Sequence, residues 1–524
     1  MFDTKATERS SILFSQNSHW LTVCLVIMFL LAALIRLNDI KTPGHLLDRE
    51  YTSAIFARAY YFANNQAVPD WQRNIAATEK TQQPVLEPPF EEYLVSLIYR
   101  VVGREDLSYA RYLTNTFWLI GGIFMFLIAR KFLSTDEAFI ATGYYLFVPM
   151  GILISRSFQP DSLMMMMFLI SLYALVYYFD ASSTKRLLFA AILTGITLLL
   201  RPLVIFAIFC AFLALSFHRH QNWKKIIDLP LIIFSIISLL PAFIYYGYGI
   251  IFAGFMRWKV TTSFMPYLLT KKDFWLGWLD NVLNVAEFIP LLLAIIGFFL
   301  LRDRKIRYLI VGLATSFVLF SLVFTYHIHT HPYYHIQLFP IVGLCLAPSV
   351  AHVIESLKKI SGKSWWIPVF AGGLLVAQFG YREVRQQLYQ YHVENPAIAR
   401  EIGELIHHSP RTVYVAYYYG LPLEYYGEFG GAPWPVRIED EFYRGPDERE
   451  LSVQERIEGL GFVPEYFVVT NFDLFNRKHQ DLKTYLQEDC ITLAQTEVYL
   501  IYGSCQSPTS FQDLPAKSVA LSRN

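Results

Sequence analysis

The sequence predicts a mainly α-helical, polytopic membrane protein that ends in a small extracytoplasmic α/β domain. Of its 524 residues, 54% are hydrophobic, 16% are aromatic and only 17% are charged, whereas charged residues make up about a quarter of an ordinary soluble domain. Apolar runs recur along most of the chain, and the pattern changes to alternating helical and extended segments after residue 380. The net charge of +1 gives no support for a nucleic-acid partner.

Apolar runs of about 20 residues have the length needed to cross a bilayer. We predict about eleven spans, at residues 20–37, 112–129, 137–155, 161–179, 187–200, 202–217, 229–250, 287–301, 308–325, 335–352 and 365–380. The apolar stretch 90–102 is shorter and contains Glu91 and Glu92, so we predict a helix that lies in the interface. The first span has no small-residue cleavage site after it, which predicts a signal anchor that is kept.

The basic residues give this set of spans an orientation, because cytoplasmic loops are enriched in Lys and Arg. With a cytoplasmic N-terminus, every short inner loop is basic, through Arg130, Lys131, Lys185, Arg186, Arg219, Lys224, Lys225, Arg302, Arg304, Lys305, Arg307, Lys358, Lys359 and Lys363. This predicts a multi-pass protein of the plasma membrane, in a bacterium the inner membrane. The outer segments are then 38–111, 155–160, 251–286, 327–335 and 381–524.

Four regions follow from this pattern: a cytoplasmic N-terminus (1–19), a membrane domain (20–380) whose first outer loop (38–111) carries interfacial helices, an outer α/β domain (381–505) and a flexible tail (506–524). In the α/β domain we predict helices at 396–407, 452–459 and near 480–487, with strands at 412–417 and 466–470 and two more within 491–502. Alternating helices and strands favour a mainly parallel sheet. Cys490 and Cys505 flank the last two strands and are the candidate disulfide, since the outer compartment permits oxidation.

In this topology the unusual polar residues all fall on the outer side. They are Asp48, Arg49 and Glu50 after the first span, Arg156, Gln159 and Asp161 before the fourth, Arg201 between the fifth and sixth, and the turn from His327 to His335 before the tenth. Acidic side chains beside a bilayer are unfavourable unless they face water or a partner. The shared side therefore predicts one polar cavity that opens to the outer leaflet.

Several of these residues have a simpler interpretation that stays open. Arg156 and Arg201 are also typical of side chains that reach lipid phosphates, and Asp161 is typical of a helix N-terminus. The tyrosines fit an interfacial aromatic belt. His329 and His331 are the candidates for a divalent metal, although no cofactor is required by any pattern in the chain.

Taken together, four motifs resemble the integral-membrane glycosyltransferases of the C-type fold. The motifs are the acids after the first span, Glu87-Pro88-Pro89 before the interfacial helix, Gln159-Pro160-Asp161, and His331-Pro332-Tyr333-Tyr334 before a late span. The nearest branch is family 39-like and contains protein O-mannosyltransferases and lipid A aminoarabinose transferases. The resemblance covers roughly residues 20–355.

The resemblance implies a polyprenyl-phosphate-linked sugar donor and an inverting transfer to a lipid, protein or glycan hydroxyl on the outer face of the membrane. It implies that Asp48 is the general base, with Glu50 as the alternative. Arginines and tyrosines are then expected to stabilise the phosphate that leaves, and our candidates are Arg49, Arg201, Tyr333 and Tyr334. Aminoarabinose transferases have a lysine where this chain has Glu87, and Lys80 is near enough in sequence to replace it.

Two other functions remain open from the sequence. A transporter or flippase of lipid-linked sugars predicts ionisable residues in the middle of spans and inverted repeats, but the ionisable residues here lie at span ends. A non-catalytic protein of envelope assembly would leave the acids near Asp48 without a chemical role.

Overall fold

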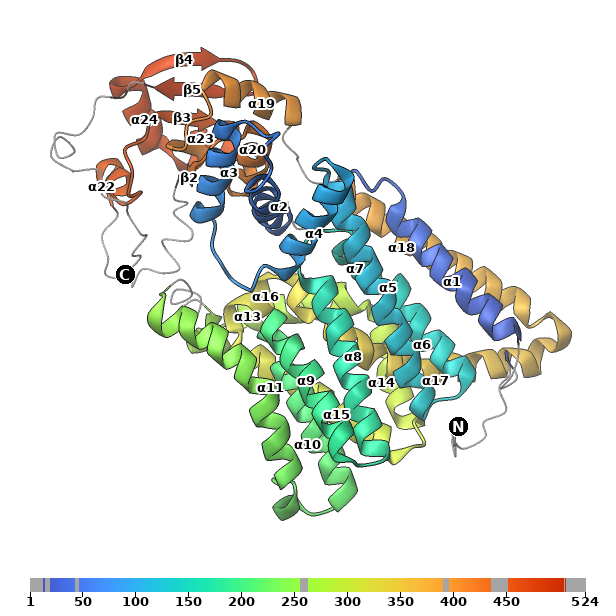
Figure 1. Cartoon of the computed structure of the whole chain (residues 1–524). Helices are drawn as coiled ribbons and strands as arrows, with labels where there is room; N and C mark the ends of the chain where they lie inside the picture. The colour runs from blue at the N-terminus through green and yellow to red at the C-terminus, as the bar shows by residue number, and fades with distance from the viewer. Residues whose placement is uncertain are drawn as a thin grey trace. The chain divides into compact units, whose positions relative to one another are not determined.

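The computed structural model describes residues 13–14, 19–42, 47–254, 263–389, 395–434, 451–503 and 505. The chain divides into two compact units. The first unit comprises Met1–His45, Leu86–Glu91 and Leu107–Gln390, and the second comprises Leu46–Val85, Glu92–Asp106 and Tyr391–Asn524. Figure 1 labels the helices and strands along the chain.

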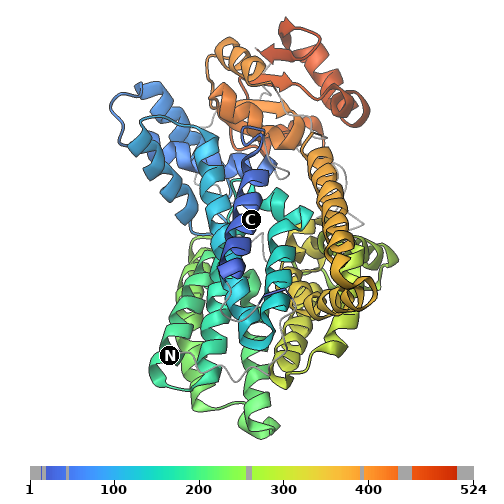
Figure 2. The same cartoon turned by 90° about the vertical axis from the view of Figure 1, so that its right-hand side faces the viewer.

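The first unit is a bundle of helices, seen from a second side in Figure 2. Its helices are α1 (His19–Leu37), α5 (Leu107–Phe132), α6 (Thr135–Phe147), α7 (Pro149–Ser155), α8 (Asp161–Asp180), α9 (Thr184–Leu200), α10 (Ile205–His220), α11 (Leu229–Gly247), α13 (Lys272–Ala286), α14 (Phe288–Leu300), α15 (Arg304–Val323), α16 (Thr325–Thr330), α17 (Leu338–Ser361) and α18 (Trp366–Tyr389). Short helical turns include η1 (Pro202–Val204), η3 (Tyr248–Phe252), η4 (Pro266–Thr270) and η5 (Pro332–His335).

The described residues contain seven helices that are long and apolar enough to cross a membrane, or up to nine if each of two bent pairs is one span. This number is smaller than the eleven predicted spans. The other two predicted spans are α9 and α18, which are helices but are not among these nine. Helix α9 has only 17 residues, because Pro202 holds the residue before it, Arg201, out of the helical region. Helix α18 becomes polar in its last turns.

The two bent pairs have local causes. Helices α6 and α7 meet at 57°, where Val148 precedes Pro149 with extended backbone angles, because a residue before proline avoids the helical region. Helices α13 and α14 meet at 87°, where Glu287 has a φ of 64°. The sequence predicted the second half of this pair, at 287–301, and missed α13.

Close contacts between helices in the first unit depend on small residues. A Cβ atom at Gly297 of α14 would lie 1.9 Å from the carbonyl oxygen of Cys345 on α17, so only glycine fits there. Such close approach of backbones is typical of helix packing in membranes, where small residues replace the hydrophobic effect as the source of tight contact.

The second unit combines helices of the first outer loop with the C-terminal α/β region. Its helices are α2 (Leu47–Phe62), α3 (Asp70–Gln82), α4 (Phe90–Val102, which begins at the boundary), α19 (Pro396–Leu405), α20 (Leu421–Gly427), α22 (Val453–Glu458), α23 (Phe472–Lys478) and α24 (Gln480–Asp489). The strands are β1 (Thr412–Val415), β2 (Gly431–Pro433), β3 (Tyr466–Val469), β4 (Ile491–Gln495) and β5 (Leu500–Gly503). Helix α4 coincides with the predicted interfacial helix.

Contacts within this unit explain why the loop helices belong to it. The guanidinium of Arg58 on α2 lies 3.8 Å from the ring centre of Tyr425 on α20 and pairs with Glu105 at 3.0 Å. The side chain of Gln82 on α3 accepts a hydrogen bond from the backbone N–H of Gly431 at 3.0 Å. We predicted the loop 38–111 as part of the membrane domain, whereas the structure groups two parts of it, Leu46–Val85 and Glu92–Asp106, with the C-terminal region.

The sheet has the strand order β2-β1-β3-β5-β4. Strand β1 is parallel to β2 and β3, but β5 is antiparallel to both β3 and β4. The prediction of a mainly parallel sheet is therefore wrong, because a connection of four residues between β4 and β5 allows only an antiparallel pair. Strand β2 and helices α20 and α23 were not predicted.

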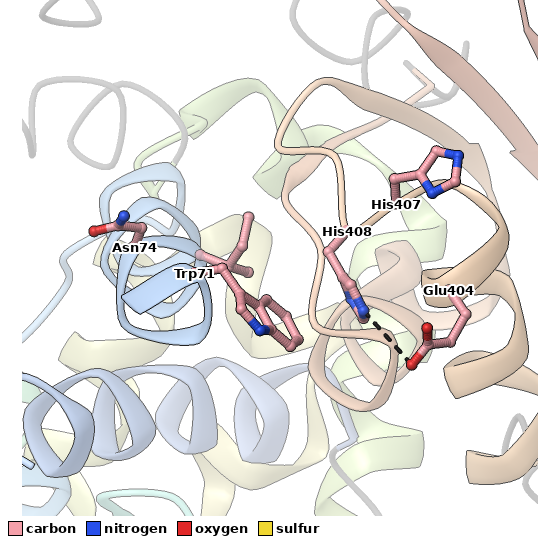
Figure 3. Close-up of a pocket in the computed structure, with 6 residues that line it drawn as sticks. Trp71, Asn74, Glu404, His407 and His408 are labelled. Carbon is pink, nitrogen blue, oxygen red and sulfur yellow. Dashed lines mark ion pairs between the residues drawn. The ribbon is translucent and has the colours of Figure 1, made fainter. Parts of the chain in front are cut away.

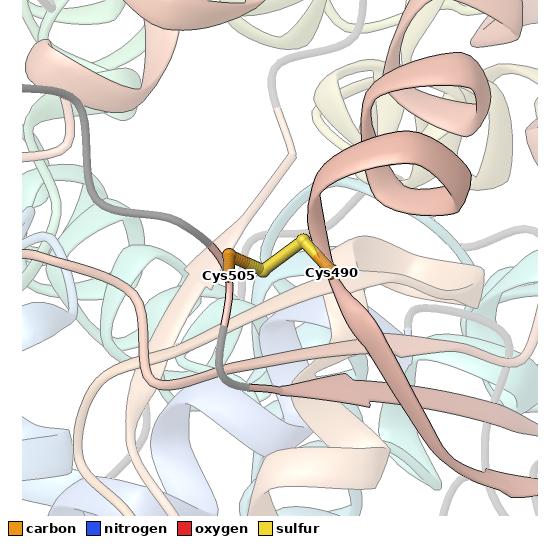
Figure 4. The surroundings of a disulfide bond; sticks show 2 residues. All are labelled: Cys490 and Cys505. Atoms are coloured by element: carbon orange, nitrogen blue, oxygen red, sulfur yellow. A yellow bond between two sulfur atoms is a disulfide. The ribbon is translucent and has the colours of Figure 1, made fainter.

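Both faces of the inner strands β1, β3 and β5 are buried, whereas the edge strand β4 is mostly exposed. Alternate residues of β1 and β3 face opposite sides, so that Val413 and Phe467 pack with α24, while Tyr414 and Val468 pack with α19. At the edge of the sheet, a disulfide joins Cys490 and Cys505, the pair that the sequence analysis selected (Figure 4).

Candidate active site

Three ionisable residues form a buried cluster in the first unit. Nη1 of Arg201 lies 2.6 Å from Oδ2 of Asp161, and Nε of Arg201 lies 3.5 Å from Oε1 of Glu87. The side chains of Arg201 and Asp161 are 4% and 1% exposed, and that of Glu87 is 16% exposed. We call these three residues the Arg201 cluster.

Prolines fix the backbone at each member of the Arg201 cluster. Arg201 ends α9 with extended angles (φ −160°, ψ 115°), because the next residue is Pro202 and a residue before proline is held out of the helical region. Asp161 follows Pro160 and begins α8, where the helix dipole favours a carboxylate. Glu87 precedes Pro88 and Pro89.

Two tyrosines of η5 border this cluster. The guanidinium carbon of Arg201 lies 6.0 Å from the ring centre of Tyr333, and Tyr334 is close enough to Arg201 for an electrostatic interaction. Both tyrosines are buried. The structure therefore brings together Glu87, Asp161, Arg201 and these tyrosines.

Tyr246 is a neighbour that the sequence analysis missed. It interacts electrostatically with Glu87 and Arg201, and its hydroxyl donates to the carbonyl of Leu199 at 3.0 Å. In the sequence it is one of two adjacent tyrosines at the end of an apolar span, which is also the pattern of an aromatic belt. No local signal distinguishes the two roles.

The side chain of Gln159 adds an unusual feature next to Asp161. It is fully buried, and neither its amide nitrogen nor its amide oxygen has a hydrogen-bond partner among the residues the structure describes. Buried polar groups in folded proteins are almost always paired. An amide without a protein partner at this position is available to a bound molecule or an ordered water.

The acids of the opening motif lie in the second unit, in the first turn of α2. Asp48 is partly exposed, and Glu50 is fully buried. The carbonyl of Asp48 accepts a hydrogen bond from the hydroxyl of Thr52 at 2.9 Å, one turn further along the helix. Arg49 is also partly exposed. That these residues face the same cavity as Arg201 stays a prediction.

Lys80 lies on α3 with its ammonium group 4.4 Å from the ring centre of Tyr60 on α2. This is the distance of a cation–π contact. That Lys80 replaces the lysine that aminoarabinose transferases have where this chain has Glu87 stays a prediction.

Arg156 supports the end of the first helix. It is buried, and its guanidinium donates to the carbonyls of Arg36 at 2.7 Å and Asp39 at 2.8 Å, and also to that of Asn38. The carbonyl of Arg36 is one that α1 leaves without an internal partner in its last turn, and those of Asn38 and Asp39 belong to the turn that follows. The structure therefore gives Arg156 a structural role, and its binding role stays a prediction.

The histidines of the outer turn are engaged in local contacts. Nδ1 of His329 lies 2.9 Å from the carbonyl oxygen of Thr325, and Nδ1 of His331 lies 2.6 Å from the hydroxyl of Thr330. Within the described part of the chain, no group of three or more His, Cys, Asp or Glu residues is arranged to hold a metal ion. The possible divalent metal at His329 and His331 stays a prediction.

The second unit contains a pair of buried carboxylates that the sequence analysis did not select. Glu424 accepts hydrogen bonds from Tyr414 at 3.0 Å and from Gln83 at 3.3 Å, and burial raises the pKa of Glu424 from 4.5 to about 8. Burial also raises the pKa of Glu79, with repulsion from Glu424 adding to this and attraction to Arg58 opposing it. Neither residue stands in a recognisable motif.

We predict that this raised pKa makes the second unit less stable as the pH rises. Between about pH 4.5 and 8, Glu424 is protonated in the folded chain and ionised in the unfolded chain, so the stabilisation is complete below pH 4.5 and is lost as the pH rises to about 8. Glu424→Gln should flatten this dependence. Hydrogen exchange of β1 and α20 in the full chain, corrected for intrinsic rates, measures it.

The exposed acid Glu488 provides the control for this measurement. Glu488→Gln should leave the pH dependence of exchange as it is in the native chain. An unchanged dependence in Glu424→Gln would show that another group is responsible.

One family model matches part of this chain. The model of the family described as dolichyl-phosphate-mannose-protein mannosyltransferase matches residues 86–245. This range includes every member of the Arg201 cluster. No curated protein sequence matches the chain.

Solved structures match over nearly the whole chain. ArnT from Cupriavidus metallidurans, bound to undecaprenyl phosphate, has a TM-score of 0.58 at 12% identity, over 92% of this chain and 98% of that one. The oligosaccharyltransferase of Archaeoglobus fulgidus, tethered with an acceptor peptide, has 0.56 at 11% identity, over 94% and 74%. The oligosaccharyltransferase AglB from that organism, with an inhibitory peptide and a dolichol-phosphate, has 0.51 at 11% identity, over 95% and 76%. These similarities confirm the predicted fold.

Proposed function

We propose that this chain, a family 39-like membrane glycosyltransferase of the C-type fold, moves a sugar from a polyprenyl-phosphate-linked donor to an acceptor hydroxyl on the outer face of the membrane. The observation that carries the proposal is the Arg201 cluster, a buried guanidinium held between two carboxylates. Its three members lie within the matched region, and the tyrosines that border it lie further along the chain. The structures of similar fold that are described with undecaprenyl phosphate and dolichol-phosphate support a donor of this chemical class.

The transfer is a single displacement at the anomeric carbon of the donor. The oxygen of the acceptor hydroxyl forms a bond to this carbon, the bond from the carbon to the phosphate oxygen breaks, and the phosphate keeps the electron pair. A base takes the hydroxyl proton. Attack from the face opposite the phosphate inverts the configuration of the sugar.

The Arg201 cluster suits the departing phosphate. A guanidinium has five N–H donors, so the contacts with Asp161 and Glu87 do not exhaust it. Charge-assisted hydrogen bonds from Arg201, together with the hydroxyls of Tyr333 and Tyr334, stabilise the negative charge that develops on the phosphate. Asp161 and Glu87 orient the guanidinium, and Arg49 is a further donor in this proposal.

Asp48 is the base that we propose, and exposure is the reason for preferring it to Glu50. A base must come within hydrogen-bond reach of the acceptor hydroxyl. Asp48 is partly exposed at the start of α2, whereas Glu50 is fully buried. The acceptor class stays open among lipids, proteins and glycans.

The location follows from the orientation predicted by the basic loops. We propose a protein of the plasma membrane, in a bacterium the inner membrane, with the N-terminus in the cytoplasm and the C-terminal region outside.

A divalent metal at His329 and His331 would make sugar transfer sensitive to a chelator. An assay of transfer with and without a chelator tests this.

Mass spectrometry of envelope glycans and glycolipids from cells with and without the gene tests the function. In cells without the gene, we expect one defined glycan or glycolipid to lack a sugar that it carries in cells with the gene. The corresponding polyprenyl-phosphate sugar should accumulate in the same cells. An unchanged profile, together with purified protein that consumes no polyprenyl-phosphate sugar, would contradict the proposal.

A further inference from the structure

The second unit contains a pocket that no part of the proposed reaction uses. It has a volume of about 540 Å³ and is lined by Trp71, Asn74 and Ile75 on α3, by Glu404 on α19, and by His407 and His408 directly after α19 (Figure 3). Sites for small molecules usually have volumes of about 300–1,000 Å³. The size of this pocket suits a sugar or a short oligosaccharide.

The wall after α19 has an uncommon backbone. His407 and His408 have φ values of 54° and 52°, in the left-handed region that residues other than glycine seldom adopt. The N–H of His408 donates to the carbonyl of Gly403 at 2.9 Å, as in a common helix ending that normally uses glycine. Each of these two successive histidines is in an unfavourable backbone conformation, and such residues cluster at binding sites.

The aromatic wall is fixed in place. The ring centres of Trp71 and His408 are 4.3 Å apart with an angle of 30° between the planes, and Nδ1 of His408 lies 3.0 Å from the carbonyl oxygen of Gly427. Trp71 is nevertheless 43% exposed. In Figure 3 the indole lies between Asn74 and His408, with Glu404 beyond the imidazole.

The charge and polarity of the lining residues favour a neutral sugar over an anion or a lipid chain. The described residues that line the pocket include no Lys or Arg, and Glu404 is an acid, so a phosphate or another anion is disfavoured. Polar side chains share the lining with apolar surface, since four of the six lining residues are polar, and a lipid chain would bury them without hydrogen-bond partners. A neutral sugar fits both features, because the C–H groups of its ring pack on an indole while its hydroxyls bond to carboxylate, amide and imidazole groups.

We propose that this pocket binds carbohydrate and that it holds a glycan part of the acceptor. The second half of this statement rests on the proposed function, since only a sugar transferase needs an acceptor. Trp71 supplies the stacking surface, His408 holds the indole in place, and Glu404, Asn74 and His407 supply the hydrogen bonds.

Saturation-transfer NMR on the full chain in lipid nanodiscs tests the proposal. The preparation must be free of maltoside and glucoside detergents, which would compete. Maltotriose, mannotriose and galactotriose are the probes, and we expect saturation of at least one of them. Trp71→Ala should weaken its binding about tenfold, or about 1.4 kcal/mol, and Glu404→Gln should weaken it less.

Trp275→Ala is the matched control, since Trp275 is 45% exposed and lies in the first unit. It should leave saccharide binding unchanged. Absence of binding by all three probes would overturn the proposal, as would equal binding by native protein and Trp71→Ala. Binding is measured without donor, so failure of sugar transfer leaves this result standing, and a chain that transfers sugar but binds no probe refutes the pocket alone.

Discussion

Asp48→Asn is expected to abolish most sugar transfer while the chain stays folded. Asparagine keeps the size of the side chain and its position in the first turn of α2, but it cannot take a proton. General base catalysis contributes about 10²–10⁴-fold to a rate, so we expect a loss of this size in kcat with little change in the affinity for donor. Transfer from a radiolabelled polyprenyl-phosphate sugar to the acceptor measures it.

Glu50→Gln distinguishes the two acids. Because Glu50 is fully buried, we expect this change to lower stability more than the rate of transfer in the chain that remains folded. The opposite outcome, with transfer retained in Asp48→Asn and lost in Glu50→Gln, would assign the base to Glu50. Retained transfer in both variants would remove the acids of this motif from the mechanism.

Arg201→Ala is expected to have the second large effect, on stability and on donor binding together. The ion pair with Asp161 is almost wholly buried. Removing one partner of a buried pair leaves an uncompensated charge and is unfavourable by about 3–5 kcal/mol. Thermal unfolding in nanodiscs should show a lower Tm, and titration with a polyprenyl phosphate should show weaker binding.

A double variant separates the two effects of Arg201. Arg201→Gln with Asp161→Asn removes both charges of the short pair, so we expect it to recover much of the stability that the single change loses. Donor binding should stay weak, because the guanidinium is still missing. If the double variant binds donor as the native chain does, Arg201 is a structural residue only.

Much of the fold was predictable because it is encoded in short stretches of sequence. Apolar length marked the helices that cross a membrane, and helix α4 and strands β1 and β3 were found at or near their predicted positions. The pairing of Cys490 with Cys505 followed from their positions on either side of one hairpin. In each case the residues that form the pattern are the same residues that form the element, within one short stretch of the chain.

The candidate site was predicted only in part. The sequence selected Asp161, Arg201 and Glu87 as separate motifs, and it gave Arg156 and Arg201 the same two interpretations. Only tertiary contacts separate them, because the guanidinium of Arg156 is occupied by backbone carbonyls and that of Arg201 by two carboxylates. Glu79 and Glu424 were missed for the same reason, since burial depends on neighbours that are distant in the chain.

The sequence by itself therefore determined the class of this protein, through span length, the side on which polar residues fall and the order of four motifs. The tertiary structure decided which charges pair, that the sheet is mixed, and that the helix carrying Asp48 packs with the C-terminal region. The physical reason is the distance along the sequence over which each interaction acts. Hydrophobic periodicity and proline restrictions act between near neighbours, whereas ion pairs and strand order join residues that lie tens to hundreds of positions apart.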